Sequence, residues 1–131
     1  MKYIGILLFF LSFSLYGQHI ESKKIDSKVL GQSRNIWIYT PWQYEEFPEK
    51  KREVIYVFDA QAREYFDVVH STIQFFGGEE YAFIVVGVES PFIKEKKQSR
   101  NTDFLPKPVN EETIKKYGEF VGGADGFISF L

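Results

Sequence analysis

The sequence predicts a protein of the α/β class, in which strands and helices alternate around a mostly parallel sheet. Two apolar runs of strand length, 54–58 and 82–88, flank a segment, 62–76, whose apolar residues recur with the period of a helix. A strand, a helix and a second strand in this order form a βαβ unit, for which a right-handed crossover is strongly favoured. Two β-prone runs precede this unit and complete the predicted sheet.

The first predicted feature is an antiparallel hairpin. Residues 25–30 and 35–39 are β-prone, and the glycine and polar residues of 31–34 provide the turn between them. Apolar residues occupy both faces of the second run, so we expect that strand to be covered on each side. Pro41 ends it, because proline has no N–H to donate to a neighbouring strand.

The βαβ unit follows a charged connection, 44–52, which we expect to be exposed. Residues 54–58 are apolar without alternation, as expected of a strand that is buried on both faces. Residues 59–61 break the run, and the helix 62–76 then carries one apolar stripe. Gly77 is available for the left-handed residue that closes the helix.

The last third of the chain is predicted to be less regular. After the strand 82–88, residues 89–110 contain three prolines and are expected to form a long irregular segment. Residues 111–117 and 125–131 are helix-like, and two glycines lie between them. We find no internal repeat.

Composition excludes several classes of function. The net charge of -2 gives no reason to expect a nucleic-acid or anionic-membrane partner, and the basic run 94–97 is typical of a solvated loop. The absence of cysteine rules out disulfides, thiolate metal sites and a cysteine nucleophile. Two histidines are too few for a convincing zinc site, so we predict no metal and no cofactor.

Residues 1–17 have the layout of a secretory signal peptide. A basic start precedes the uncharged apolar run 4–15, and Gly17 offers a small residue for cleavage. The apolar run is shorter than the roughly 20 residues that a membrane-spanning helix needs. We therefore expect a secreted or periplasmic protein without a stable membrane anchor after cleavage, and one domain in residues 18–131. The alternative is an uncleaved anchor.

Four segments in a fixed order carry a family resemblance that extends over nearly all of residues 18–131: 34–41 (RNIWIYTP), 54–60 (VIYVFDA), 100–106 (RNTDFLP) and 122–127 (GGADGF). They are similar to a family of secreted esterases that includes the enterochelin (siderophore) esterases. The resemblance implies an α/β-hydrolase fold with sheet order 1-2-4-3-5, and hydrolysis of a small-molecule ester.

The resemblance also implies which residues lie at the site. One amide of the oxyanion hole in this fold comes from the loop after the third strand, which corresponds here to Asp59, Ala60 and Gln61. The family often has glycine where Ala60 stands. Arg100 and Asp103 are expected at the rim of the cleft. There the guanidinium would bind an anionic substrate or brace the loop by pairing with a carboxylate; the alternative is a local salt bridge between these two residues.

No catalytic residue is expected within the chain. The nucleophile motif G-x-S-x-G does not occur, and Ser129 lacks the buried strand that precedes a nucleophile elbow, so we interpret it as an ordinary helix residue. His70 precedes the position where the serine would appear, and we expect a partly packed surface histidine. His19 lies almost at the new terminus after cleavage. The nucleophile and the base are therefore expected after Leu131, and the chain alone is expected to be inactive.

Three functional hypotheses remain at this point. The chain is the N-terminal half of an exported serine ester hydrolase, or a non-catalytic secreted binding module that reuses the half-fold, or one part of a split enzyme. In the implied sheet order, one edge of the strand 54–58 is bare. Such an edge favours pairing with another chain, so we expect self-association.

Overall fold

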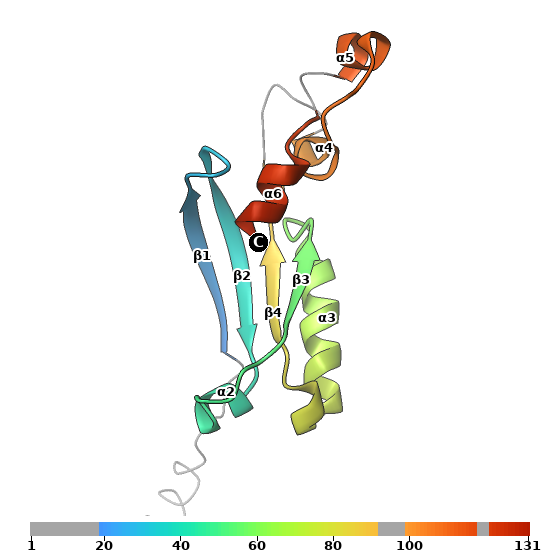
Figure 1. Cartoon of the computed structure of the whole chain (residues 1–131). Helices are drawn as coiled ribbons and strands as arrows, with labels where there is room; N and C mark the ends of the chain where they lie inside the picture. Colours follow the sequence, from blue (N-terminus) through green and yellow to red (C-terminus); the bar gives the residue numbers. More distant parts are fainter. Residues whose placement is uncertain (1–18, 92–98, 118–120) are drawn as a thin grey trace, which may run out of the picture.

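The computed structural model describes residues 19–91, 99–117 and 121–131 (Figure 1). The predicted signal segment 1–17 and the basic run 94–97 lie outside the described residues. The elements in chain order are β1 (His19–Ser27), β2 (Gln32–Thr40), α2 (Gln43–Glu46), β3 (Val54–Phe58), α3 (Arg63–Phe76), the 3-10 helix η1 (Glu79–Tyr81), β4 (Ile84–Val88), α4 (Ser99–Phe104), α5 (Glu111–Tyr117) and α6 (Ala124–Phe130).

The four strands form one mixed sheet in the order β1-β2-β4-β3. β1 and β2 pair antiparallel, β2 and β4 pair antiparallel, and β3 and β4 pair parallel. The predicted α/β class and the order of the first four strands are confirmed. Helices α4, α5 and α6 gather beyond the end at which β3 and β4 finish, whereas α2 and η1 lie at the opposite end (Figure 1).

The hairpin is present, but the predicted bounds of its first strand were wrong. β1 begins at His19 and ends at Ser27, and Leu30 lies in the turn before Gly31, whose φ of 65° is left-handed. The polar residues 21–24 concealed the strand, because β1 is at the edge of the sheet and much of it is exposed. An edge strand of this kind needs no apolar alternation.

The βαβ unit is confirmed. Helix α3 packs on one face of the sheet, and Gly77, with a φ of 61°, closes the helix as expected. Gly87 of β4 is required for this packing, because a Cβ there would lie 2.7 Å from Cδ2 of Phe66 and 2.9 Å from Cβ of Ala60. The core between the sheet and α3 consists of Tyr39, Val57, Ala60, Phe66 and Val85.

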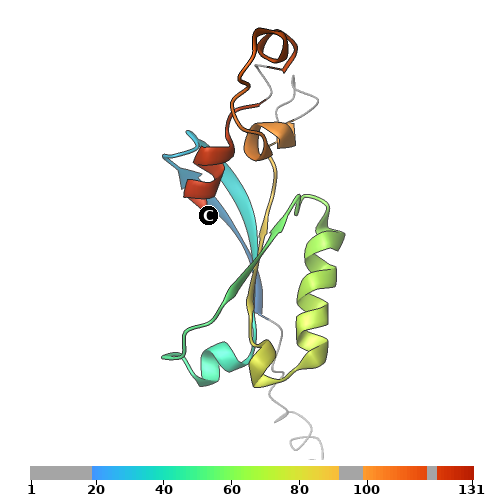
Figure 2. The ribbon, with the colours of Figure 1, turned by 45° about the vertical axis from the view of Figure 1, so that its right-hand side comes forward.

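The opposite face is covered only in part. Figure 2 shows α3 on one side of the sheet and α6 on the other, near one end. A second cluster forms there, in which Ile36, Val88 and Phe127 are buried. β2 is thus covered from both sides, as predicted, since Ile36 and Tyr39 are 6% and 3% exposed.

The prediction that β3 is buried on both faces was wrong. Val54, Tyr56 and Phe58 are 42%, 40% and 40% exposed, while Val57 on the α3 face is buried. The reason is that α6 reaches the sheet only near the end of β3, so most of this face of the strand is not covered by any of the described elements (Figure 2). An unbroken apolar run does not reveal which of its two faces has a partner.

Two connections contain helices that were not expected. The exposed connection 44–52 overlaps the short helix α2, and the irregular segment 89–110 contains α4. The helices predicted at 111–117 and 125–131 are present as α5 and α6. Among the described residues, no helix is long and apolar enough to cross a membrane.

Candidate functional site

The candidate site lies where the parallel strands end. β3 is followed by Asp59, Ala60 and Gln61, and β4 by Glu89 and Ser90. In open α/β sheets, ligands bind outside the carboxyl ends of the strands. The two loops therefore bring the predicted oxyanion segment to the edge of the sheet that suits a ligand.

Asp59 has an unusual backbone. Its φ of 58° makes it the only described residue other than glycine with a left-handed conformation. Residues with a Cβ adopt this conformation seldom, although aspartate tolerates it better than most. Such a conformation persists only where the surroundings determine it, and it is often associated with functional sites.

The Asp59 carboxylate has partners on two other elements. Its Oδ1 accepts a hydrogen bond of 2.8 Å from Oγ of Ser90, and its Oδ2 lies 2.8 Å from NH2 of Arg100. Gln61 joins the same group, since its Nε2 is 3.4 Å from Oδ1 of Asp59 and its Oε1 accepts from N of Ser90 at 2.9 Å. We call Asp59, Gln61, Ser90 and Arg100 the Asp59 network.

The backbone amides of the loop are not equivalent. The N–H of Ala60 donates to the carbonyl of Val88 at 3.1 Å, and the N–H of Ala62 donates to the carbonyl of Asp59 at 2.9 Å. The N–H of Gln61 has no acceptor among the residues that the structure describes. Of the three predicted loop residues, Ala60 thus has an amide that is already engaged, whereas Gln61, like Asp59, has an amide without an acceptor among the described residues.

The first turn of α3 supports a negative charge near this loop. Helix α3 has 14 residues and begins at Arg63, directly after the loop, and no side chain caps its first N–H groups. The positive end of the helix dipole favours an anion there. This effect adds to that of a free amide at Gln61.

Arg100 and Asp103 do not pair with each other. Arg100 binds Asp59, and its side chain is 62% exposed. Asp103 binds NH2 of Arg34 at 2.6 Å, and both of these side chains are nearly inaccessible, at 4% and 1%. The local salt bridge is therefore not formed, and the geometry matches the alternative in which Arg100 braces the loop. Asp103 lies beneath the surface rather than on an exposed rim.

The buried pair of Arg34 and Asp103 attaches α4 to the start of β2. Burial raises the pKa of Asp103 above its ordinary value, and the nearby Arg34 guanidinium opposes this rise. The Nε and NH1 atoms of Arg34 and Oδ2 of Asp103 are buried without a hydrogen-bond partner among the described residues. Sequence reasoning placed Arg34 in a turn and missed this contact; a charged residue beside an apolar strand was the available signal.

The histidine and the serine considered in the sequence lie elsewhere. His70 was expected at the surface, but it is 5% exposed and stacks on Tyr39, with 5.4 Å between ring centroids. Its Nε2 lies 3.1 Å from Oδ1 of Asp67, so it belongs to the contact between α3 and the sheet. The Oγ of Ser129 donates to the carbonyl of Asp125 in α6 at 2.8 Å, as in many ordinary helices.

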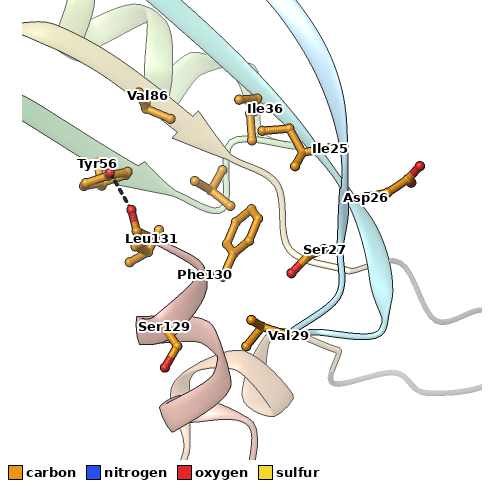
Figure 3. A pocket seen from close by; sticks show the side chains of 11 residues that line it. Ile25, Asp26, Ser27, Val29, Ile36, Tyr56, Val86, Ser129, Phe130 and Leu131 are labelled. Carbon is orange, nitrogen blue, oxygen red and sulfur yellow. Dashed lines mark hydrogen bonds between the residues drawn. The ribbon is translucent and has the colours of Figure 1, made fainter.

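A cavity of about 450 Å³ opens on the partly covered face of the sheet (Figure 3). The ring of Phe130 projects from the end of α6 toward the sheet, and the hydroxyl of Tyr56 donates to the carbonyl of Leu131 at 2.8 Å. A second cavity of about 390 Å³ lies between α4 and α5, with Leu105, Pro108 and Tyr117 in its wall. Among the described residues, no group of three or more His, Asp or Glu side chains could hold a metal ion.

Known proteins resemble this chain in structure, whereas no family model and no curated protein sequence matches its sequence. The siderophore hydrolase EstA from Aspergillus nidulans superimposes with a TM-score of 0.63 over 90% of this chain, at 18% identity. The chain has the fold of the α/β-hydrolase esterases. The BES protein from Bacillus cereus (TM-score 0.60, 25% identity, 89% of this chain) and an IroE-like serine hydrolase from Shewanella oneidensis (0.60, 21%, 86%) are also similar.

The α/β-hydrolase fold is present here in part. The chain spans 41% of the Aspergillus protein, 46% of the Bacillus protein and 35% of the Shewanella protein. The similarity to these structures shows the fold, and it is the fold that the resemblance found in the sequence implies.

Proposed function

We propose that this chain is the N-terminal portion of an exported serine carboxylic-ester hydrolase, similar to the siderophore esterases, and that it supplies the oxyanion loop and the rim of the cleft. The proposal rests most on the Gln61 amide, which is free of any described acceptor at the carboxyl end of β3. One structural neighbour is a siderophore hydrolase, which supports a small-molecule ester as substrate.

The chemistry assigned to the chain is stabilisation of negative charge. Attack of a serine on an ester carbonyl gives a tetrahedral intermediate whose oxygen is negative, and amides fixed in advance bind it. Removing one such donor typically lowers kcat by about 10²–10³. We assign one donor to Gln61 and the second to the residue after the nucleophile. The nucleophilic serine and the histidine base are proposed to lie outside these 131 residues.

Export completes the proposal. Residues 1–17 are proposed to act as a cleaved signal peptide, which would place the protein in the periplasm or outside the cell. We propose no nucleic-acid partner and no stable membrane anchor after cleavage. Mass spectrometry of the protein from an exporting host tests this point: a new N-terminus near Gln18 is expected, and an intact Met1 in the exported fraction would contradict it.

The central experiment begins with the DNA that follows the codon for Leu131. We expect a G-x-S-x-G motif in the same or a shifted frame, and a protein that includes it should hydrolyse p-nitrophenyl acetate. Replacing the motif serine by alanine should abolish this activity, while the 131-residue chain should have none. Unrelated DNA after a clean stop, or activity that survives loss of the serine, would contradict the proposal.

A non-catalytic binding module is the second candidate. The observation in its favour is the apolar cavity of about 450 Å³ on the open face of the sheet, which could hold an apolar ligand without any chemistry. A stable monomer that binds a fluorescent apolar probe in this cavity, together with the absence of a downstream nucleophile motif, would favour it. The split enzyme would instead require a second chain that restores ester hydrolysis when the two are mixed.

A further inference from the structure

We propose that Asp59 is a positioning residue, whose carboxylate, held by Ser90 and Arg100, fixes the turn after β3 so that the Gln61 amide stays available to an oxyanion. This inference rests on the proposed function for its chemical meaning. Its structural content concerns only residues of this chain and can be tested without an active enzyme.

The backbone of Asp59 shapes the turn after β3. The carbonyl of Asp59 accepts from N–H of Ala62 at 2.9 Å, and this bond closes the turn that contains Gln61. The left-handed φ of 58° at Asp59 is part of that turn. The φ and ψ of Asp59 set the direction in which this turn leaves β3, so a different conformation at Asp59 would move the whole turn relative to the end of the strand. The position of the Gln61 amide therefore depends on the conformation of Asp59.

The side chain of Asp59 holds this backbone in place. Its two oxygens are bound from two directions: Oδ1 by the hydroxyl of Ser90 after β4, and Oδ2 by Arg100 of α4, each at 2.8 Å. The side chain of Asp59 is only 16% exposed, so water competes weakly for it. A carboxylate held at both oxygens cannot rotate without losing one partner. This arrangement makes the left-handed backbone the stable one.

The two partners of the Asp59 carboxylate differ in exposure. The Arg100 side chain is 62% exposed, and exposed ion pairs contribute little to stability. The Ser90 hydroxyl is partly buried, and the amide of Ser90 also binds Oε1 of Gln61 at 2.9 Å. Ser90 thus ties both residues of the turn to the end of β4. We expect Ser90 to matter more than Arg100 for the geometry of the loop.

The test is nuclear magnetic resonance on the ¹⁵N-labelled chain. Two quantities are measured: the coupling between the amide and α protons of residue 59, which reports φ, and the hydrogen-exchange rate of the Ala62 amide. In Ser90→Ala and in Asp59→Asn we expect the coupling to change and Ala62 exchange to accelerate about tenfold or more, because the turn opens locally. The Ala60 amide, bonded to Val88 within the sheet, should keep its protection.

Conservative variants separate positioning from general stability. Arg100→Gln should accelerate hydrogen exchange at Ala62 by a smaller factor than Ser90→Ala. Arg100→Lys, which keeps the positive charge, should exchange at the wild-type rate. Asp125→Asn, at an exposed carboxylate of α6, is the matched control and should change neither quantity. Chemical shifts of β4 residues show whether each variant is folded.

An unchanged coupling and unchanged Ala62 exchange in a folded Ser90→Ala/Arg100→Gln double variant would overturn the inference. Equal acceleration at Ala60 and Ala62 would also overturn it, since the network would then stabilise the sheet as a whole. The proposed function fails by a different result, the absence of serine-dependent ester hydrolysis in the longer protein. The two failures are therefore distinguishable.

Discussion

The two faces of the sheet differ in how they are completed. On the α3 face, Phe66 and Val85 are fully buried, at 0% exposure, and one amphipathic helix packs against β3 and β4. On the other face, α6 covers one end, and Val54, Tyr56 and Phe58 of β3 remain about two-fifths exposed. The α3 face is therefore a finished core, whereas the other face, here called the open face, has apolar surface that a further element could cover.

The largest expected effect is on the finished core. Phe66→Ala should lower the free energy of unfolding by roughly 3–5 kcal/mol, because it removes a completely buried ring and leaves a cavity. Phe58→Ala is the matched variant on the open face, where the ring is 40% exposed; its loss should be less than about 2 kcal/mol. Denaturant unfolding measures both values. Equal losses would remove the distinction between the faces.

The ion pair of Arg34 and Asp103 tests how firmly α4 is attached to β2. Removing one member leaves a buried charge without its partner, so Arg34→Met should cost roughly 3–5 kcal/mol, again by denaturant unfolding. Arg34→Met/Asp103→Leu should recover most of this loss, because two apolar side chains need no partner. A loss below about 1 kcal/mol for the single variant would indicate a pair that behaves as if exposed.

Gly87 tests how closely α3 approaches the sheet. A Cβ at this position would lie 2.7 Å from the Phe66 ring and 2.9 Å from Ala60, so Gly87→Ala should destabilise the protein by about 1–3 kcal/mol. Gly126→Ala, in α6, is the matched control, since its nearest neighbour would be 3.8 Å away. The control should stabilise α6 by about 0.5–1 kcal/mol. Thermal unfolding of both variants gives the two signs.

The open face leads to a prediction about association. β3 is an outer strand of the sheet, and its exposed side chains are apolar. We expect the chain to self-associate, and Val54→Lys/Tyr56→Lys to shift sedimentation-velocity profiles toward monomer, because two ammonium groups oppose burial of that face. Val68→Lys, at a 65% exposed position on α3, is the control and should leave the profile unchanged. A wild-type chain that is monomeric at high concentration would contradict the expectation.

The sequence predicted the fold well wherever local pattern determines structure. The strand, helix and strand at 54–88 could be predicted because two unbroken apolar runs flank a segment with a helical period, and Gly77 marked the end of the helix. The burial of β3 could not be predicted, because an unbroken apolar run is compatible with a strand that is covered on one face or on both. β1 was misplaced for the opposite reason: an exposed edge strand can be polar and still pair along its whole length.

The sequence predicted where the site residues lie along the chain, but not which residues they contact. The family resemblance located Asp59, Ala60 and Gln61 after β3, but only the structure distinguishes the engaged amide of Ala60 from that of Gln61. Arg100 pairs with Asp59 and not with Asp103, while Asp103 pairs with Arg34. Arg34 reaches Asp103 across 69 positions of sequence, a separation at which spacing carries no information. Contacts of this kind depend on how α4 folds back on the sheet.

The smallest expected effect concerns the charged groups along the finished face. The hydrogen bond from Arg63 lowers the pKa of Asp67, and His70 contributes in the same direction. A lowered pKa means that the carboxylate stabilises the fold above the ordinary carboxyl range, and that this contribution is lost as the pH falls through the lowered value. Between about pH 5 and 3, wild type should therefore lose more stability than Asp67→Asn, by denaturant unfolding at each pH. Because Asp67 is 45% exposed, the difference should be small, and Asp125→Asn should keep the wild-type slope. If Asp67→Asn also keeps that slope, the Arg63 and Asp67 pair makes no net contribution to the α3 face.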